Sequence, residues 1–243
     1  MGKTRTRVQK PKEGRGRSRS KYQEKQEVKE VRKNFNLKPL NQKQKEYINL
    51  IKNKQVVIAF GPAGTAKTFC PSVIAAELFF NKEINNITII RPYEGCGRSI
   101  GLLPGSVNEK MLPICQPVIS ILNRYLGNSV VEYALSHNQI IMQPLEFVRG
   151  MTFDDTFVII DEAQNLNIDS IKALLTRVGT NCRMIISGDV SQKDIRGDSG
   201  LTWLIRLADK ADLDIGIVEF EIKDIVRSGF VKEFITAMWN YER

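Results

Sequence analysis

Residues 56–68 read VVIAFGPAGTAKT, five mostly aliphatic residues followed by a glycine-containing loop that ends in lysine and threonine. An apolar stretch predicted to be a helix over 67–80 begins at the lysine of this loop. A strand, a loop and a helix in this order form a phosphate cradle, because backbone N–H groups of the loop and of the helix N-terminus point at one spot. The stretch therefore predicts a phosphate site. A glycine-rich turn that happens to precede a lysine is the alternative.

Within this loop the residue types match those that bind ATP and Mg²⁺. Lys67 is predicted to reach the β- and γ-phosphate oxygens, and the Thr68 hydroxyl is predicted to bind Mg²⁺. The residue before the lysine is Ala66 where the usual pattern has glycine. A methyl group there is acceptable if the backbone is already helical. The residues predicted to contact the nucleotide here are Gly61, Pro62, Ala63, Gly64, Thr65, Ala66, Lys67 and Thr68.

A second motif lies about 95 residues further on, where a predicted strand over 157–161 ends in two carboxylates, Asp161 and Glu162. At the tip of such a strand Asp161 can hold the water shell of Mg²⁺ near Thr68. Glu162 is the predicted catalytic base, which polarises a water for in-line attack on the γ-phosphorus. A solvated strand end is the alternative, but that reading fits one carboxylate better than two. A kinase would not need Glu162, because its substrate brings the nucleophile.

A third apolar strand, predicted over 183–187, runs into Gly188 and Asp189, with Gln192 close behind. If this strand lies between the phosphate loop and the carboxylate strand, its tip reaches the γ-phosphate. Gln192 is then the candidate sensor of that phosphate, and Asp189 helps to organise the site. The alternative is an ordinary turn after a strand.

Short strands rich in Ile and Val alternate with amphipathic stretches from residue 40 onwards. This alternation predicts an α/β fold with a mainly parallel sheet covered by helices on both faces. The stretch 92–138 has four prolines and is expected to be an irregular insertion at the sheet edge. Strands are expected over 56–60, 87–91, 139–142, 157–161, 183–187 and 216–221. Helices are expected over 67–80, 116–126, 169–178, 201–210 and 230–239.

The chain has 243 residues and a formal net charge of +9, which is unevenly placed. Residues 1–34 hold 13 Lys or Arg and 4 Glu, whereas residues 35–243 hold 23 basic and 23 acidic residues. With almost no large apolar side chains, 1–34 is predicted to be a disordered basic arm ahead of one folded domain over 35–243. The arm is expected to contact RNA or single-stranded DNA phosphates. A solvated tail that aids solubility is the alternative.

Other classes of protein fit the sequence poorly. Four widely spaced cysteines and a single histidine, His137, make no recognisable zinc site. No run approaches 18 apolar residues, and the N-terminus has charge without an apolar segment, so we expect no membrane partner and a cytoplasmic protein. A metal hydrolase lacks ligands, and no Arg-rich lid segment supports a kinase.

These segments together resemble the PhoH family of P-loop ATPases, which is similar to the first motor domain of superfamily 1 helicases. The resemblance covers about residues 40–240. Its ordered matches are Asn41-Gln42-x-Gln44, GPAGTAKT, Arg91-Pro92, Gly101-x-Leu103-Pro104-Gly105, Glu109-Lys110, Pro144-Leu145, Arg149-Gly150-x-Thr152, DEAQN at 161–165, Leu175-Thr176-Arg177-x-Gly179, Gly188-Asp189-x-x-Gln192, Ser199-Gly200-Leu201 and Asp224-x-Val226-Arg227.

The resemblance implies a RecA-like core with nucleotide at the C-terminal ends of the strands. It also implies that Gln44 reads adenine and that Arg227 contacts the γ-phosphate. Gly95 and Arg98 stand where the family usually has acidic residues, and Ser228 stands where it usually has histidine. Without the family, the segment DIVRSG (224–229) places a guanidinium at a strand-to-helix turn, which suits an arginine finger. A surface or ion-paired arginine is the alternative.

Arg91, at the tip of the strand predicted over 87–91, has two interpretations. It contacts a nucleic-acid phosphate, or it braces the loop beside it.

Two functional hypotheses follow from one nucleotide site on a single RecA-like domain. The first is a Mg²⁺-dependent ATPase that acts on RNA or single-stranded DNA as a homo-oligomer such as a hexamer, with its arginine finger crossing an interface. The second is an ATP-binding regulatory switch or adaptor with slow, incidental hydrolysis. Such a protein is expected in a bacterial cytoplasm, or in an infected host cell if a phage encodes it.

Overall fold

The computed structural model describes residues 2, 35–92, 107–148, 150–192 and 199–241. The chain divides into two units, Met1–Lys33 and Asn34–Arg243. The predicted basic arm, apart from Gly2, lies outside the described residues. So do Gly95, Arg98, Arg149 and the 101–105 motif. The described helices and strands all belong to the second unit.

A six-stranded sheet forms the centre of this unit, and every neighbouring pair of strands is parallel. The strand order is β3-β2-β4-β5-β1-β6, so β3 and β6 are the edge strands. All six predicted strands are confirmed, β1 with its predicted bounds and the other five with ends shifted by one or two residues. Their bounds are β1 Val56–Phe60, β2 Asn86–Ile90, β3 Ile140–Gln143, β4 Thr156–Ile160, β5 Arg183–Gly188 and β6 Gly216–Glu219.

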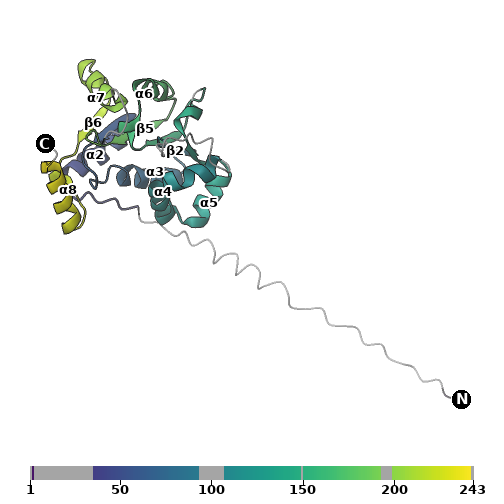
Figure 1. The fold of residues 1–243 in the computed structure, drawn as a ribbon. Coiled ribbons are helices and arrows are strands. Elements are labelled where there is room, and N and C mark those ends of the chain that lie inside the picture. Colours follow the sequence, from purple (N-terminus) through teal and green to yellow (C-terminus); the bar gives the residue numbers. More distant parts are fainter. Residues whose placement is uncertain (1, 3–34, 93–106, 149, 193–198, 242–243) are drawn as a thin grey trace. The chain divides into compact units, whose positions relative to one another are not determined.

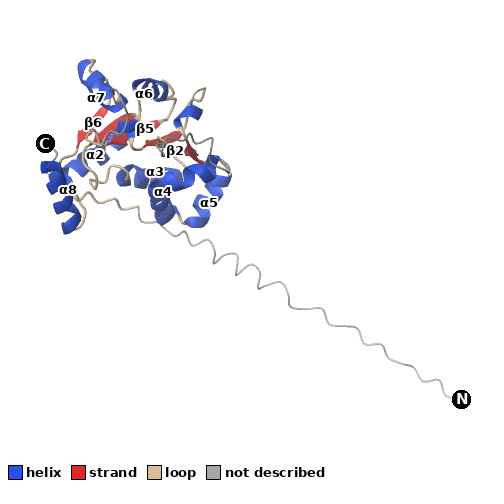
Figure 2. Ribbon diagram, in the orientation of Figure 1, coloured by secondary structure: helices blue, strands red, loops and turns tan. Residues whose placement is uncertain are grey.

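Both faces of the sheet are buried, because side chains on either side of each strand pack into a separate apolar cluster. In β4, Phe157 and Ile159 join one cluster, whereas Val158 and Ile160 join the other. This alternation is the period-two geometry of a strand. Figures 1 and 2 show helices on both sides of the sheet, with α3, α4 and α5 on one side and α6 and α7 on the other. The predicted two-face covering is therefore confirmed.

The helices largely follow the predicted segments, with shifted ends and two additions. The first addition is α2, whose N-cap Asn41 accepts a hydrogen bond from the Gln44 N–H. The second is α5, which follows α4 directly. The bounds are α2 Gln42–Asn53, α3 Phe69–Phe80, α4 Val107–Leu126, α5 Asn128–Ser136, α6 Ile168–Leu175, α7 Gly200–Lys210 and α8 Gly229–Tyr241. Short 3₁₀ helices are η2 Leu145–Val148, η3 Ala163–Asn165 and η4 Ile222–Asp224.

The stretch predicted to be irregular is mostly helical where it is described, which corrects that expectation. Helix α4 continues through Pro113 and Pro117. Its core-facing residues Met111, Cys115, Val118, Ile119 and Leu122 recur with helical spacing and are all buried. Burial of this stripe outweighs the two backbone hydrogen bonds that the prolines cannot make. None of the described helices is long and apolar enough to cross a membrane.

Candidate nucleotide site

Polar residues gather at one edge of the sheet, because the C-terminal ends of parallel strands meet there. Strand β1 leads into the glycine loop, β4 into Asp161 and β5 into Asp189. As predicted, β5 lies between β1 and β4. These ends open into a cavity of about 550 Å³. Among its lining residues are Gln44, Ala63, Gly64, Ala66, Lys67, Thr68, Arg91, Asp161, Glu162, Asp189, Gln192 and Arg227.

The glycine loop has a backbone that most residues avoid. Gly61 and Gly64 have φ of 130° and 84°. A Cβ atom at Gly64 would lie 2.7 Å from Cγ of Arg227, so the loop and the segment before α8 approach too closely for a side chain. The Val226 N–H donates to the Gly64 carbonyl at 3.0 Å and ties the two segments together. Glycine at position 64 is thus required both by its φ and by its neighbour.

Ala66 does not meet the condition under which its methyl group is acceptable. Its φ is +74°, so the backbone before Lys67 is left-handed and not helical. A left-handed conformation costs an L-residue with a Cβ roughly 1–2 kcal/mol. The methyl group is therefore held under strain, and the glycine of the usual pattern would adopt this conformation freely. Helix α3 begins only at Phe69, two residues after the predicted start.

Lys67 points back into its own loop. Its Nζ donates to the carbonyl oxygens of Gly61 at 2.6 Å and of Pro62 at 2.8 Å. Burial lowers the pKa of the Lys67 ammonium, while the nearby Asp189 and Asp161 carboxylates oppose that shift. The Lys67 ammonium thus lies beside the phosphate cradle, where nearby carboxylates only partly offset the cost of burying its charge.

Asp161 connects the loop to two strands. Its Oδ1 accepts from the Thr68 hydroxyl at 3.1 Å and from the Ser187 hydroxyl at 3.0 Å. Burial raises the pKa of this carboxyl group above its usual range, and the Arg91 guanidinium and the two hydroxyls act in the opposite direction. The structure therefore brings together Thr68 and Asp161, the two residues predicted to bind the metal.

Glu162 is held at both carboxylate oxygens. Its Oε1 accepts from Arg91 Nη2 at 2.8 Å, and its Oε2 accepts from Gln164 Nε2 at 2.7 Å. Arg91 also donates to the Ile114 carbonyl at 2.7 Å, so it links the carboxylate to α4. The Glu162 backbone is left-handed, with φ of 55°. Of the two interpretations of Arg91, this geometry favours bracing, although the group braced is Glu162.

Gln164 is a site residue to which the sequence analysis gave no role. Besides donating to Glu162, its Oε1 accepts from the Asp189 N–H at 2.9 Å. It thus joins the carboxylate motif to the end of β5. Its position in DEAQ was the available signal, but its second partner is 25 residues away in sequence.

The two residues predicted after β5 both lie at the cavity. Asp189 is buried, and its Oδ1 accepts from the N–H and hydroxyl of Ser191. Its Oδ2 is buried with no hydrogen-bond partner among the described residues. The Gln192 N–H donates to the Asp189 carbonyl at 3.0 Å, and Gln192 lines the cavity. The sensor role of Gln192 stays a prediction.

Helix α2 holds the glycine loop through hydrogen bonds to two of the loop's carbonyl oxygens. Gln44 is buried, accepts from the Leu40 N–H at 2.9 Å and donates to the Thr65 carbonyl at 3.4 Å. One of the two Nε2 donors and one of the two Oε1 acceptor positions are used, so one donor and one acceptor of Gln44 remain. The adenine-reading role of Gln44 stays a prediction. Tyr47, which the sequence analysis did not identify, is fully buried and donates to the Lys67 carbonyl at 3.0 Å.

The segment before α2 forms one wall of the cavity. Leu37, Lys38 and Leu40 line it. Phe35 anchors this segment, because its ring lies 5.4 Å from that of Phe80 and 6.1 Å from that of Tyr125, measured between centroids. The start of the folded unit therefore belongs to the site.

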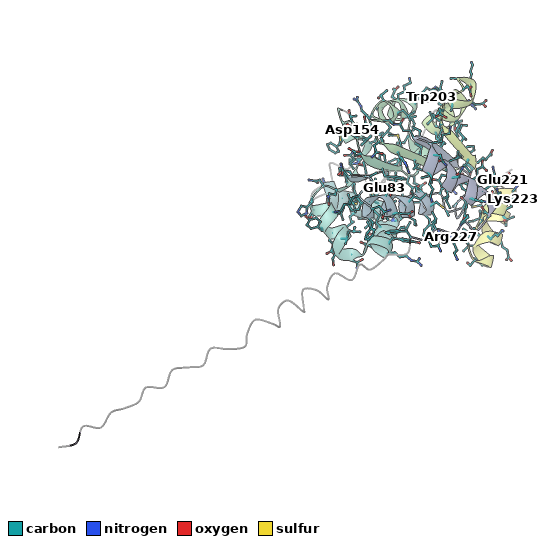
Figure 3. The ribbon with its side chains drawn as sticks, turned by 180° about the vertical axis from the view of Figure 1, so that it is seen from behind. Glu83, Asp154, Trp203, Glu221, Lys223 and Arg227 are labelled. Atoms are coloured by element: carbon teal, nitrogen blue, oxygen red, sulfur yellow. The ribbon has the colours of Figure 1, made fainter. Side chains whose placement is uncertain are left out.

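Arg227 lies at the cavity of its own chain. It is exposed, lines the cavity and packs its Cγ over Gly64. Figure 3 shows Arg227 and the neighbouring Glu221–Lys223 ion pair on the same side of the molecule, ahead of α8. The segment is a 3₁₀ helix and a loop, so Arg227 follows η4 and not a strand.

The residues present fit a magnesium nucleotide. Hydroxyl and carboxylate oxygens are ligands that Mg²⁺ prefers, and Thr68 and Asp161 supply them side by side. Positive φ values at Gly61, Gly64 and Ala66 shape the concave backbone that holds anions. Lys67 and Arg227 bring positive charge to the same cavity.

Comparison with known proteins agrees with this geometry. Residues 36–239 match the family model described as PhoH-like protein. The chain belongs to the PhoH family. A PhoH-like protein of Bacillus subtilis is 38% identical over 213 residues, which are 86% of this chain and 66% of that protein. Protein PhoH of Escherichia coli K12 is 36% identical over 201 residues, 81% of this chain and 56% of that protein.

The PhoH relatives are longer than this chain, which spans about 60% of the length of mycobacterial members. Among solved structures, the large terminase of a thermophilic bacteriophage has a TM-score of 0.51 at 13% identity. That match covers 83% of this chain and 50% of the terminase. At this identity the likeness concerns the fold alone. It agrees with the RecA-like fold that the resemblance implied.

Proposed function

We propose that this PhoH-family protein is a Mg²⁺-dependent ATPase that acts on RNA or single-stranded DNA as a homo-oligomer in the cytoplasm. The observation that carries the proposal is the hydrogen bond between Thr68 and Asp161, with Glu162 as the next residue. It joins the phosphate loop to the carboxylate strand in one site. The basic composition of 1–34 supports the nucleic-acid part of the proposal.

Each residue has a distinct task in this proposal. A bound Mg–ATP would supply an electrophilic γ-phosphorus and a leaving group. Lys67 would leave the Gly61 and Pro62 carbonyls to neutralise phosphate charge, and Thr68 and Asp161 would hold the metal. Glu162 orients a water and accepts its proton. Because Arg227 packs over Gly64 of the same chain, we expect it to act on the nucleotide bound by that chain.

A regulatory ATP switch with slow hydrolysis is the second candidate, and the resting geometry favours it in one respect. Glu162 is bound at both oxygens and Lys67 is bound to two carbonyls. All these bonds must change before turnover. A site that rests in this way has low basal activity until a partner rearranges it.

Steady-state ATP hydrolysis with and without single-stranded RNA and DNA tests the two candidates, with Glu162→Gln as the blank. An ATPase that acts on nucleic acid should be stimulated by it, and removal of residues 1–34 should abolish the stimulation. Hydrolysis equal to the blank under every condition, together with tight ATP binding that Lys67→Ala removes, would overturn the ATPase in favour of the switch.

A further inference from the structure

Asp189, which follows β5 and lines the nucleotide cavity, is firmly held but has one carboxylate oxygen to spare. The residue is 5% exposed. Its N–H donates to Gln164 Oε1 at 2.9 Å, and its Oδ1 accepts from the N–H and the hydroxyl of Ser191 at 3.1 and 2.6 Å. Its Oδ2 is buried with no hydrogen-bond partner among the described residues. Because a buried carboxylate oxygen without a donor costs free energy, this atom points to a donor that arrives when the site changes state.

Lys67 is the group that can supply this donor. Two of its three N–H groups donate to the Gly61 and Pro62 carbonyls, which leaves one. The Gly61 N–H donates to the Gly188 carbonyl at 3.3 Å, so the lysine rests on a residue that is itself bonded to the end of β5. Asp189 is the next residue of the chain. Burial lowers the pKa of the Lys67 ammonium, and Asp189 is the charge that opposes this shift most.

The other carboxylates at the cavity already have partners. Asp161 accepts from the Thr68 hydroxyl, with which it is predicted to hold Mg²⁺. Glu162 accepts hydrogen bonds from side chains at both of its oxygens. Among these three acidic residues, Asp189 is therefore the one with a buried oxygen that is left for a cation.

We propose that Asp189 is a positioning residue for Lys67 in the nucleotide-bound state. When the ammonium leaves the Gly61 and Pro62 carbonyls for the phosphate oxygens, it donates its remaining N–H to Asp189 Oδ2. The lysine is then held between the carboxylate and the nucleotide, and this second contact fixes the direction of its other N–H groups. The inference rests on the proposed function, because it takes the cavity to be an ATP site.

Asp189→Asn tests this role, since it removes the charge but keeps the shape and an oxygen for Ser191. Loss of a negative charge beside a triphosphate should by itself tighten ATP binding, because like charges repel. The proposal predicts the opposite sign, because Lys67 loses its partner. With EDTA present to remove Mg²⁺, the affinity for a fluorescent ATP analogue should fall at least about tenfold.

AMP distinguishes an effect through Lys67 from general damage to the pocket. Lys67 is predicted to contact the β- and γ-phosphates, which AMP lacks. The affinity for AMP, measured by displacement of the fluorescent analogue, should therefore be the same in Asp189→Asn and in the wild type. Asp209→Asn, at an exposed position of α7, is the matched control for the lost charge and should bind both nucleotides like the wild type.

Three results of the binding experiment would overturn the inference. The first is ATP binding by Asp189→Asn in EDTA that is unchanged or tighter. The second is a loss that appears only when Mg²⁺ is present, which would assign Asp189 to the metal. The third is an equal loss of AMP and ATP binding, which would show a structural role.

A second measurement needs no nucleotide. Urea denaturation gives the effect of Asp189→Asn on the midpoint of unfolding, both in the wild type and in Lys67→Met. In Lys67→Met the buried Asp189 charge has lost the ammonium that offsets it. Asp189→Asn should therefore raise the midpoint more in that background than in the wild type. Equal changes in the two backgrounds would overturn the link between the two side chains.

Failure of this inference and failure of the proposed function are distinguishable. A wild type that binds no ATP would overturn the proposed function, and the inference with it. A wild type that binds ATP, with Asp189→Asn binding it equally well in EDTA, would overturn the inference alone.

Discussion

The Arg91 guanidinium donates to the Glu162 carboxylate at 2.8 Å, so the residue that follows β2 fixes the candidate base that follows β4. The two strands are neighbours in the sheet. Because Arg91 also donates to the Ile114 carbonyl, the position of α4 is transmitted to Glu162.

Replacement of Arg91 by alanine should lower kcat for ATP about 10- to 100-fold with a smaller change in KM, because a misplaced base costs rate more than binding. Arg91→Lys should recover only part of the loss, since an ammonium cannot reproduce the two-pronged contact. Arg124→Ala, an exposed arginine of α4, is the control. Steady-state kinetics decide the matter, and an unchanged kcat for Arg91→Ala would contradict a positioning role.

Ala66→Gly should raise the free energy of unfolding by about 0.5–1 kcal/mol, because relief of the left-handed strain outweighs the added freedom of the unfolded chain. Urea denaturation measures the change. Ala63→Gly is the matched control in the same loop, where φ is not positive, and it should give no gain. A loss of stability in Ala66→Gly would contradict the strain.

Asp161→Asn should stabilise the fold at neutral pH while it removes Mg²⁺-dependent hydrolysis. The pKa of Asp161 is higher in the folded protein than its ordinary value of 3.8. Between the pKa of the unfolded chain and the higher pKa of the folded protein, the folded state therefore binds more protons than the unfolded state. Stability from this group therefore falls as pH rises through that window, and the buried charge costs stability above it. An amide cannot ionise, and it keeps an oxygen for Thr68 and Ser187.

The expected gain for Asp161→Asn is on the order of 1 kcal/mol at pH 7, and it should vanish below the unfolded pKa. Urea titrations at several pH values measure it. Asp169→Asn, at an exposed position of α6, controls for the loss of one charge. A gain that persists at low pH would show that charge burial is not its cause.

Two variants of Gln164 should separate its contact with Glu162 from its contact with the Asp189 N–H. Gln164→Leu removes the donor to Glu162 and the acceptor for the Asp189 N–H, so kcat should fall and stability should drop by about 1–3 kcal/mol. Gln164→Glu keeps the acceptor for the Asp189 N–H but buries a carboxylate beside Glu162, so it should lose activity, and its loss of stability should shrink at low pH, where the carboxyl groups are protonated. At low pH Gln164→Glu should therefore lose less stability than Gln164→Leu. Equal stability losses in the two variants at low pH would contradict the contact with Asp189.

Much of the architecture is accessible from sequence, because the strands are apolar throughout and the motifs sit at their ends. The sheet, the two-face covering and the meeting of Thr68 with Asp161 follow from that pattern. The helix predicted over 116–126 is confirmed, but its extension back to residue 107 and the helix over 128–136 do not follow, since prolines mask a buried stripe in the first and only tertiary packing reveals the second. Arg91, Gln164 and Tyr47 each form a hydrogen bond with a residue 20 to 71 positions away in the chain. A local sequence pattern gives no sign of such bonds. The strain at Ala66 escapes any prediction that treats the loop as helical there.

The anchoring of Phe35 against Phe80 and Tyr125 decides where the protein can be cut. A protease or a designed truncation that removes residues up to 34 leaves the cavity wall of Leu37, Lys38 and Leu40 in place. A cut after Leu40 instead removes that wall together with the Leu40 N–H that orients Gln44. The shorter product would still fold around its sheet, yet its affinity for nucleotide would describe a damaged pocket.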